Sequence, residues 1–256
     1  MPDIFFTPEY QDLFAETEFG GKCGYVSCED NDYRFYKNQI PETYYFDIVS
    51  PYGYSGPNLG KSNSYWDAEF HKDCIKRNII AEFARLHPYI ENHKLLPPEN
   101  IEYAGEVFYV DLTKPFDFDK GCKAAINKAS RTAIKTLDSF SLQEFKEVYW
   151  KTMARRQTTK AYFFDDSFFE RLSKLPGIIL GAFHQGKLAC CISILAYGDY
   201  AHYFLSGSDP ELRGLNANNL LLYEGMRWAK FKGCKIFNVG GTFAGDKGLL
   251  SFKKSF

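Results

Sequence analysis

The sequence predicts an α+β protein made of two similar domains, each with a mixed, largely antiparallel sheet flanked by helices. The first observation is the length, since 256 residues are enough for two domains that each bury a core. The second is composition: 45% of the residues are hydrophobic and 18% are aromatic, which supplies side chains for two cores. The third is a repeated order of patterns in the two halves, which we interpret as a structural duplication. We place the boundary at Pro115, between residues 1–115 and 116–256.

The first half of the chain contains the patterns of a meander, a loop, a helix and a strand. Runs rich in apolar and aromatic residues at 22–30, 34–40 and 44–50 predict three strands. Residues 51–63 contain Gly and Pro and predict a loop. Ser64 followed by Asp67 resembles a helix N-cap signature, so residues 64–77 predict a helix, and 79–88 predict a strand.

The second half repeats this order after a short connecting region. In that region residues 107–112 predict a strand and 119–137 a helix, and Ser141 with Glu144 forms a capping box that opens another helix. Residues 177–207 predict an antiparallel meander, because "HQGK" and "GD" are turn signals between three apolar runs. Residues 208–218 predict a loop, 219–233 an amphipathic helix that ends at Gly233, and 234–241 a strand.

Charge and cysteine usage narrow the class of protein. A net charge of -1 and a pI near 6.5 argue against binding to DNA or to nucleic acid in bulk. The seven cysteines cannot all pair within the chain, which favours a reducing compartment. Asp3 and Glu9 interrupt the start of the chain, and no apolar run reaches the roughly 20 residues of a membrane span. We therefore expect a cytoplasmic protein without a transmembrane segment.

The junction between the meander of the second half and the helix that follows is a candidate anion site. A strand there leads through a loop to a helix start near Asn216, where free backbone N–H groups and the helix dipole favour negative charge. The loop supplies Arg213 and Gly214. The alternative interpretation is an ordinary connection in which Asn caps the helix.

The predicted helix 119–137 carries a basic face. Lys128, Arg131 and Lys135 are spaced at i, i+3 and i+7. This face is either a solvated surface, which is the usual case, or a stripe that contacts phosphate.

No metal site is expected. Cys23 and Cys28 are not spaced as a CxxC pair, and the same holds for His71 and Cys74, for which no further ligands are evident. The chain also lacks a G-x-S-x-G motif and a P-loop.

Seven segments, taken in order, resemble the Fem-type branch of the GNAT superfamily, which includes peptidoglycan-bridge aminoacyl transferases and acetyltransferase-like proteins of bacterial polysaccharide pathways. The segments are "DIVSPYGYSGP", "AEFARLHPYIEN", "VFYVDLTK", "CKAAINKASRTAIK", "YWKTMARRQTTKAYFF", "YFLSGSDPELRGLNANNLLLYEGMRWAKFKG" and "FNVGGTFAGDKGLLSFKKSF". The resemblance implies two tandem GNAT-like domains, with the main active site in the second.

The resemblance also implies transfer of an acyl or aminoacyl group to an amine. Fem enzymes take the group from aminoacyl-tRNA, and ordinary GNAT enzymes take it from acyl-CoA, whose pyrophosphate rests on the helix start after the meander. The corresponding donor site here comprises Arg213, Gly214, Asn216, Ala217 and Asn218. The chain departs from the family pattern in that it lacks the tRNA-associated coiled-coil insertion, a carboxylate after "YGYSGP" and the usual glycines of the donor loop.

We therefore expect an N-acyltransferase that moves an acetyl or aminoacyl group from acyl-CoA, a co-substrate and not a tightly bound cofactor, to an amine of a cell-envelope sugar or peptidoglycan-type precursor. The acceptor is expected to be a small, lipid-linked or nucleotide-linked amino sugar. Tyr203, on the third strand of the second meander, is the candidate for a catalytic proton relay, the alternative being a core tyrosine. Arg131 and Arg156 lie in family-like segments and are expected to bind the acceptor.

The last residues, "FKKSF", match an F-K-x-x-F sequence near the end of Fem proteins, in which the lysine is implicated in binding charged groups of the substrates. The resemblance assigns this role to Lys253, between Phe252 and Phe256. If residues 248–256 form a strand, both phenylalanines face the core and Lys253 points the opposite way, toward the site. The alternative is a solvated terminal lysine.

Two other functions stay open at this point. One is an aminoacyl-tRNA-dependent transferase of the same fold, in which Arg155 and Arg156 contact RNA phosphates. The other is a non-catalytic module that binds a phosphorylated glycan.

Overall fold

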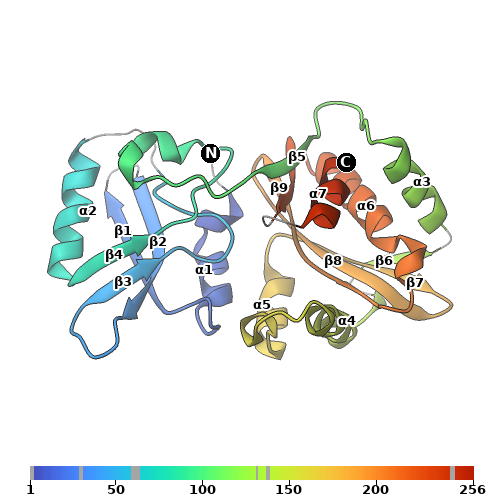
Figure 1. Ribbon diagram of the computed structural model, residues 1–256, viewed down its shortest axis with the longest axis horizontal. Coiled ribbons are helices and arrows are strands. Elements are labelled where there is room, and N and C mark those ends of the chain that lie inside the picture. Colours follow the sequence, from blue (N-terminus) through green and yellow to red (C-terminus); the bar gives the residue numbers. More distant parts are fainter. Residues whose placement is uncertain (1–2, 29–30, 59–63, 131, 137–138, 243–245) are drawn as a thin grey trace. The chain divides into compact units, whose positions relative to one another are not determined.

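The computed structural model describes residues 3–28, 31–58, 64–130, 132–136, 139–242 and 246–256. The chain divides into two compact units (Figure 1). The first unit is Phe5–Tyr103, and the second unit combines Met1–Ile4 with Ala104–Phe256. Strand β5 (Val107–Asp111), which the sequence boundary at Pro115 assigned to the first domain, pairs with a strand of the second unit and belongs there.

The first unit contains a sheet of strand order β1-β2-β3-β4. The first three strands are antiparallel, and β4 runs parallel to β3. Helix α1 was not predicted; it starts at Pro8, and the hydroxyl of Thr7 caps it by accepting a hydrogen bond from the Tyr10 amide. The elements are α1 (Pro8–Phe14), β1 (Lys22–Cys28), β2 (Asn31–Gln39), β3 (Phe46–Val49), α2 (Ser64–Lys76) and β4 (Ile79–Phe83), with 3-10 turns at Ile4–Phe6, Asn92–Leu95 and Pro98–Asn100.

The second unit contains a six-stranded sheet of order β5-β10-β9-β8-β7-β6. All neighbouring strands are antiparallel except β9 and β10, which are parallel. The elements after β5 are α3 (Lys120–Ala129), β6 (Ala133–Thr136), α4 (Leu142–Arg155), η5 (Lys160–Tyr162), α5 (Asp166–Lys174), β7 (Gly177–His184), β8 (Lys187–Tyr197), β9 (Tyr200–Ser208), η6 (Arg213–Leu215), α6 (Ala217–Phe231), β10 (Ile236–Gly241) and α7 (Lys247–Lys254).

The predicted duplication is confirmed at the level of topology. In the first unit β1, β2 and β3 form a meander, α2 follows, and β4 then lies parallel to β3. In the second unit β7, β8 and β9 form a meander, α6 follows, and β10 then lies parallel to β9. The protein is therefore a tandem α+β fold, and each unit has a mixed sheet flanked by helices.

Helices cover both faces of the second sheet. Helices α3 and α6 lie on one face, and α4 and α5 lie on the other (Figure 1). Two glycines allow close packing: a Cβ on Gly207 would lie 2.6 Å from the Tyr149 amide nitrogen of α4, and one on Gly225 would lie 1.9 Å from Ile194. The core between α6 and the sheet includes the buried residues Ile192, Ile194, Leu221, Met226 and Phe237.

The predicted helix over residues 119–137 is wrong in its second half. Helix α3 ends at Ala129, where the amide and the hydroxyl of Thr132 both donate to the Ala129 carbonyl, at 2.9 and 2.7 Å. Residues 133–136 instead form strand β6, which pairs with β7. Lys128 and Lys135 therefore do not share a helix face, and Arg131 lies outside the described residues.

The predicted terminal strand over residues 248–256 is also wrong. Helix α7 forms there, and its N-cap Asp246 accepts a hydrogen bond of 2.8 Å from the Leu249 amide. Phe252 lies in α7 and Phe256 lies two residues beyond its end, and their rings meet edge to face at 5.4 Å. Across the part of the chain that the structure describes, no helix is both long and apolar enough to cross a membrane.

Candidate active site

The site begins where β9 and β10 separate. Their parallel pairing covers only three positions, from Tyr200 opposite Ile236 to His202 opposite Asn238. Beyond this point β9 also carries a β-bulge at Phe204, because Ser193 of β8 pairs with Leu205 while the next residue pairs with Tyr203. A bulge locally redirects side chains. Among the described residues, the last part of β9 therefore has no strand paired with it on the edge that faces β10.

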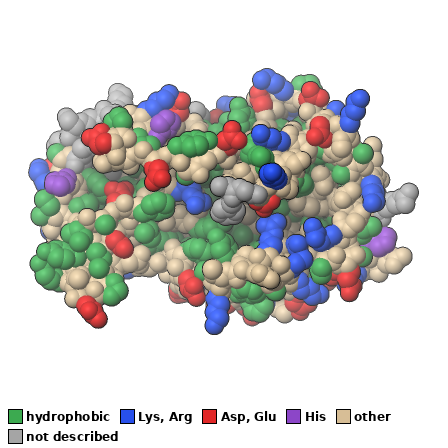
Figure 2. All heavy atoms as spheres, viewed as in Figure 1, with side chains coloured by type: hydrophobic (Ala, Val, Ile, Leu, Met, Phe, Trp, Pro, Cys, Tyr) green, Lys and Arg blue, Asp and Glu red, His purple; other side chains and the backbone are tan. Residues whose placement is uncertain are grey.

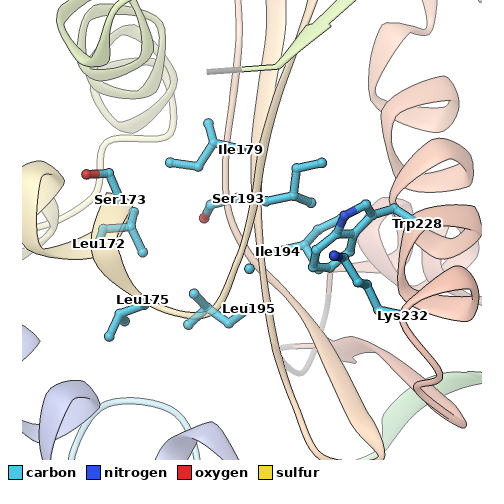
Figure 3. Close-up of a pocket in the computed structure, with 11 residues that line it drawn as sticks. Leu172, Ser173, Leu175, Ile179, Ser193, Ile194, Leu195, Trp228 and Lys232 are labelled. Atoms are coloured by element: carbon cyan, nitrogen blue, oxygen red, sulfur yellow. The ribbon is translucent and has the colours of Figure 1, made fainter. Parts of the chain in front are cut away.

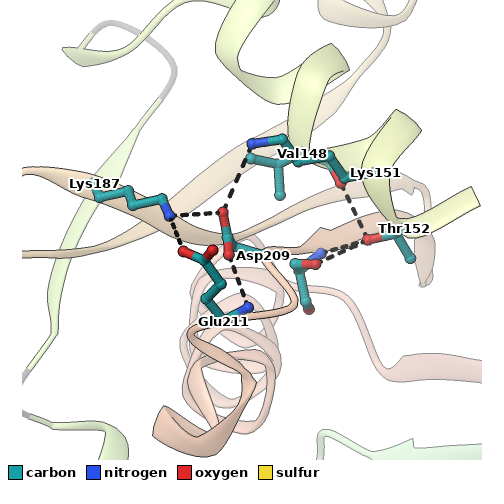
Figure 4. A network of polar contacts seen from close by, with 7 residues as sticks. Val148, Lys151, Thr152, Lys187, Asp209 and Glu211 are labelled. Atoms are coloured by element: carbon teal, nitrogen blue, oxygen red, sulfur yellow. Dashed lines mark hydrogen bonds and ion pairs between the residues drawn. The ribbon is translucent and has the colours of Figure 1, made fainter. Parts of the chain in front are cut away.

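The loop from β9 to α6 is held by a buried carboxylate. The side chain of Asp209 is 3% exposed and lies 3.3 Å from Lys187 and 3.8 Å from Lys151, and it accepts a hydrogen bond of 3.0 Å from the Glu211 amide (Figure 4). Burial acts to raise the pKa of Asp209, but the Glu211 amide and Lys187 outweigh it and lower that pKa. Asp209 therefore stays ionised and fixes the loop that carries Arg213.

The end of α4 is tied to the same loop. The Ser208 amide donates to the Thr152 hydroxyl at 2.8 Å, and that hydroxyl lies 3.2 Å from the Ser208 carbonyl (Figure 4). Thr152 is buried one turn before the C-terminus of α4. This link brings Arg155 and Arg156 to the end of β9.

The start of α6 is open to an anionic ligand. Asn216 is the N-cap with φ 57°, and its side chain makes no capping hydrogen bond. The Asn219 amide donates to the Asn216 carbonyl at 3.0 Å, but no side-chain cap covers the amides of Ala217 and Asn218, which present the positive end of the helix dipole. Arg213 and Gly214 are exposed in η6, directly before this turn, whereas the side chain of Ala217 is buried in the core, so only its backbone can contact a ligand.

Tyr203 points at the helix start. Its hydroxyl lies 3.3 Å from Oδ1 of Asn218, which also accepts from the Cys190 thiol at 3.7 Å. Burial is the largest influence on this phenol and raises the pKa of Tyr203 to about 12. Tyr203 is therefore a neutral hydroxyl at physiological pH, able to donate or relay a proton and not present as a phenolate.

Lys253 enters from α7 and is 9% exposed. Its Nζ donates to the Gly241 carbonyl at 2.5 Å. Burial, followed by the Arg156 guanidinium, lowers the pKa of Lys253 to about 8, although Asp246 acts in the opposite direction. Gly240 leaves room for this amine, since a Cβ at that position would lie 2.9 Å from Nζ.

Three arginines surround these groups. The guanidinium of Arg156 acts electrostatically on both Tyr203 and Lys253. Burial, and then the charges of Arg213 and Arg156, lower the pKa of Arg155. None of the three arginines forms an ion pair with any residue that the structure describes. Figure 2 shows Lys and Arg side chains gathered on the visible face of the second unit. This unneutralised charge is suited to binding an anion.

The structure thus brings together most of the residues that the sequence singled out. Phe252 is an exception, because its ring packs against the core and is not directed at a substrate; it lies near the site only as the neighbour of Lys253 in α7. Sequence reasoning missed the polar chain behind Lys253, which runs from Asn238 to His202 and Asp3. A partial signal was present in "NVGG", since Asn before a glycine pair is typical of a side-chain-capped turn.

A separate pocket of about 330 Å³ lies away from these residues (Figure 3). Trp228 and Lys232 line it from the C-terminal end of α6, and Leu172 lines it from α5. At 1.5 Å per residue, α6 separates Trp228 from Asn216 by roughly 18 Å. This pocket therefore does not belong to the site at the helix start.

The model of the acetyltransferase (GNAT) domain matches residues 120–254, more than half of the chain. The protein belongs to this family. It is accordingly an acyltransferase of the GNAT type, and the helix start, Tyr203 and Lys253 all lie within the GNAT domain. No curated protein sequence matches the chain.

Solved structures share the tandem GNAT fold. FemX superposes with a TM-score of 0.71 at 14% identity, covering 96% of this chain and 91% of FemX. L-PGS from Bacillus licheniformis gives 0.63 at 18%, covering 94% of this chain and 78% of that one. The C-terminal domain of a putative lysylphosphatidylglycerol synthetase from Agrobacterium fabrum gives 0.61 at 13%, covering 99% and 81%. At these identities the likeness concerns the fold, which is that of the Fem-type GNAT branch.

Proposed function

We propose that the protein transfers an acetyl or aminoacyl group from acyl-CoA to an amine of a cell-envelope sugar or peptidoglycan-type precursor. The observation that carries this proposal is the convergence of Tyr203, Lys253 and Arg156 beside the open start of α6 within a GNAT domain. The likeness in fold to FemX and L-PGS supports the envelope as the setting.

The donor would bind through its phosphates. The uncapped amides of Ala217 and Asn218 at the start of α6 suit a pyrophosphate, and Arg213 and Arg155 lie where they can hold the remaining charge. Such binding needs no metal and no permanently bound cofactor.

The reaction is direct attack of a neutral amine on the thioester carbonyl. The C–N bond forms and the amine loses a proton, while the C–S bond breaks and the thiolate takes up a proton. Lys253, largely protonated at pH 7 because its pKa is about 8, can donate a hydrogen bond to the developing oxyanion or to a substrate phosphate. The Tyr203 hydroxyl can relay this proton: it gives its own proton to the leaving sulfur and takes up the proton that the amine loses, so it ends the step as a neutral hydroxyl.

Ligand binding to the whole chain tests this proposal before the acceptor is known. Acetyl-CoA and CoA at 100 times their dissociation constant should stabilise the protein by about 2.7 kcal/mol in thermal unfolding. Amino-sugar nucleotides should then cause release of free thiol from acetyl-CoA. Stabilisation by the acceptors alone, with no thiol release from any donor, would instead indicate the non-catalytic glycan-binding module.

The second candidate is an aminoacyl-tRNA-dependent transferase. The observation that favours it is the number of arginines without an ion-pair partner among the described residues, since Arg155, Arg156 and Arg213 exceed what one pyrophosphate requires. Binding of the acceptor arm of tRNA should then weaken steeply as salt is raised. If the protein does not bind RNA even at about 50 mM salt, this candidate is ruled out.

Tyr203→Phe tests the proton relay. The substitution removes one hydroxyl and its bond to Asn218 but keeps the ring, so the melting temperature should change by no more than about 3 °C. If the hydroxyl protonates the leaving group, kcat should fall at least about tenfold with little change in the donor KM. Equal kcat in Tyr203→Phe and the wild type would leave Tyr203 as a core tyrosine. Tyr197→Phe, on an exposed ring of the adjacent strand β8, is the matched control.

A further inference from the structure

The turn at the end of β10 is built around Asn238. Asn238 is 2% exposed and is the last residue of β10 that pairs with β9. Its pairing with β5 is interrupted immediately afterwards, since Asn238 lies opposite Tyr109 and Gly240, two residues on, lies opposite Phe108. The extra residue makes a bulge, and Gly240 takes φ 87°.

Both ends of the Asn238 amide are used. Its Oδ1 accepts a hydrogen bond of 2.7 Å from the Gly240 amide. An atom that accepts from an N–H is the oxygen, so the other atom is Nδ2, which donates to Nδ1 of His202 at 3.2 Å. His202 Nδ1 is therefore unprotonated, and its Nε2–H donates to the carboxylate of Asp3 at 2.8 Å.

This chain of contacts is buried along its length. Asp3 is 1% exposed, and His202 is 2% exposed. The low local dielectric strengthens these buried hydrogen bonds. Breaking one of them would leave a buried polar group without a partner, which costs free energy. The Asn238 side chain therefore has one orientation, fixed by His202 at its Nδ2 and by the Gly240 amide at its Oδ1.

The turn that Asn238 fixes is the one that holds the lysine. Gly240 follows the captured amide with its positive φ, and the next carbonyl, that of Gly241, accepts the hydrogen bond from Lys253 Nζ. The Lys253 amine is also close to Gly240 itself, where the absence of a Cβ leaves its space. The position of the amine thus depends on the conformation of two backbone units.

We propose that Asn238 is the positioning residue of the site: His202 and Asp3 lock its amide, and its Oδ1 sets the turn whose Gly241 carbonyl holds the Lys253 amine. The relevance of Asn238 to catalysis rests on the proposed acyl transfer. The hydrogen bonds of Asn238 and Lys253 do not depend on that proposal. Asn238 touches no reacting atom and acts only through Lys253.

The test is the titration of Lys253 in the free protein, which needs no substrate. Lysines labelled with ¹³C at Cε are followed by NMR against pH, and the Lys253 signal is assigned by its loss in Lys253→Met. The wild-type midpoint should be near 8. In Asn238→Ala the amine loses its acceptor and swings toward water, so the midpoint should rise by about one pH unit or more.

Two variants separate positioning from general destabilisation. Asn238→Ser keeps a neutral hydroxyl oxygen that can accept from the Gly240 amide and should bring the midpoint back toward the wild-type value, although it loses the donor to His202. Asn92→Ala removes a buried asparagine of the first unit that donates to the Ser55 and Pro57 carbonyls, and should lower stability without moving the Lys253 midpoint.

The outcomes are distinct. A midpoint that shifts in Asn238→Ala and returns in Asn238→Ser supports the proposal, even if no acyl transfer is ever detected. A folded Asn238→Ala protein with an unchanged Lys253 midpoint overturns it, and so does a shift of equal size in Asn92→Ala. Where turnover is measurable, Asn238→Ala should lower kcat at least about tenfold while the donor KM stays within about twofold.

Discussion

Lys253→Met is expected to remove most of the transferase activity while raising the melting temperature at pH 7. The buried amine donates to one carbonyl and carries a charge that burial and Arg156 disfavour. Lowering its pKa from 10.5 to about 8 corresponds to about 3 kcal/mol of unfavourable interaction of the charged form. Methionine fills a similar volume without the charge, and water can reach the half-buried Gly241 carbonyl. The melting temperature should rise by about 2 °C or more, and kcat/KM should fall at least about tenfold.

The pH dependence gives a second test of the same substitution. Between pH 8 and 10.5 the unfolded chain holds a proton on Lys253 that the folded protein has released. The free energy of unfolding of the wild type therefore increases as pH rises through that window, and the buried charge destabilises the folded protein by its full amount below pH 8. The advantage of Lys253→Met should be largest at pH 7 and should shrink by pH 10. Unfolding by denaturant at both pH values measures it.

Lys254 provides the matched control, because it is the next residue of α7 and its side chain is exposed. Lys254→Met should change neither kcat/KM nor the melting temperature by more than the error of measurement. If Lys253→Met lowers the melting temperature by several degrees, the amine is a structural support. If both substitutions have equal, small effects on turnover, Lys253 has no role in the reaction.

The sequence predicted the second meander and its topology well, because these depend on local signals. The turns at Gln185–Gly186 and Gly198–Asp199 lie where "HQGK" and "GD" placed them. Ser141 and Glu144 form the predicted capping box. These motifs are complete within a few residues, so recognising them requires no knowledge of residues distant along the chain.

Short elements near ends were less predictable. The alternation in "LLSFKKSF" fits a strand, but the cap at Asp246 starts a helix that contains Phe252 and ends at Lys254, two residues before Phe256. Both rings still pack against the core. In the helix that forms instead of the strand, Lys253 is buried and its amine donates to the Gly241 carbonyl, and its role at the site stays a prediction.

The polar chain behind Lys253 was beyond sequence reasoning. His202 and Asp3 are 199 residues apart along the chain, and no local pattern connects them. Only the pairing of β9 with β10 brings His202 level with Asn238. A buried contact of this kind is fixed by tertiary structure, and its members look like ordinary polar residues in the sequence.

The arginines should divide into an acceptor group and a donor group. Arg156 acts on Tyr203 and Lys253, so Arg156→Gln should raise the acceptor KM about tenfold, the effect of losing one charge-assisted hydrogen bond. Arg155 and Arg213 act on each other beside the start of α6, so the double change Arg155→Gln with Arg213→Gln should raise the donor KM at least about tenfold. That double variant should also flatten the dependence of donor binding on salt.

Stability separates these roles from a structural one. None of the three guanidiniums has an ion-pair partner among the described residues, and they repel one another, so their removal should leave the melting temperature unchanged or slightly higher. Arg227→Gln is the control, because this exposed arginine lies on α6 and is already paired with Glu224. It should alter neither KM. A donor KM that rises as much in Arg156→Gln as in the double variant would refute the division. A melting temperature lowered by more than about 5 °C in either variant would show that these arginines stabilise the fold. An arginine without an ion-pair partner among the described residues can contribute to stability only through packing of its aliphatic stem.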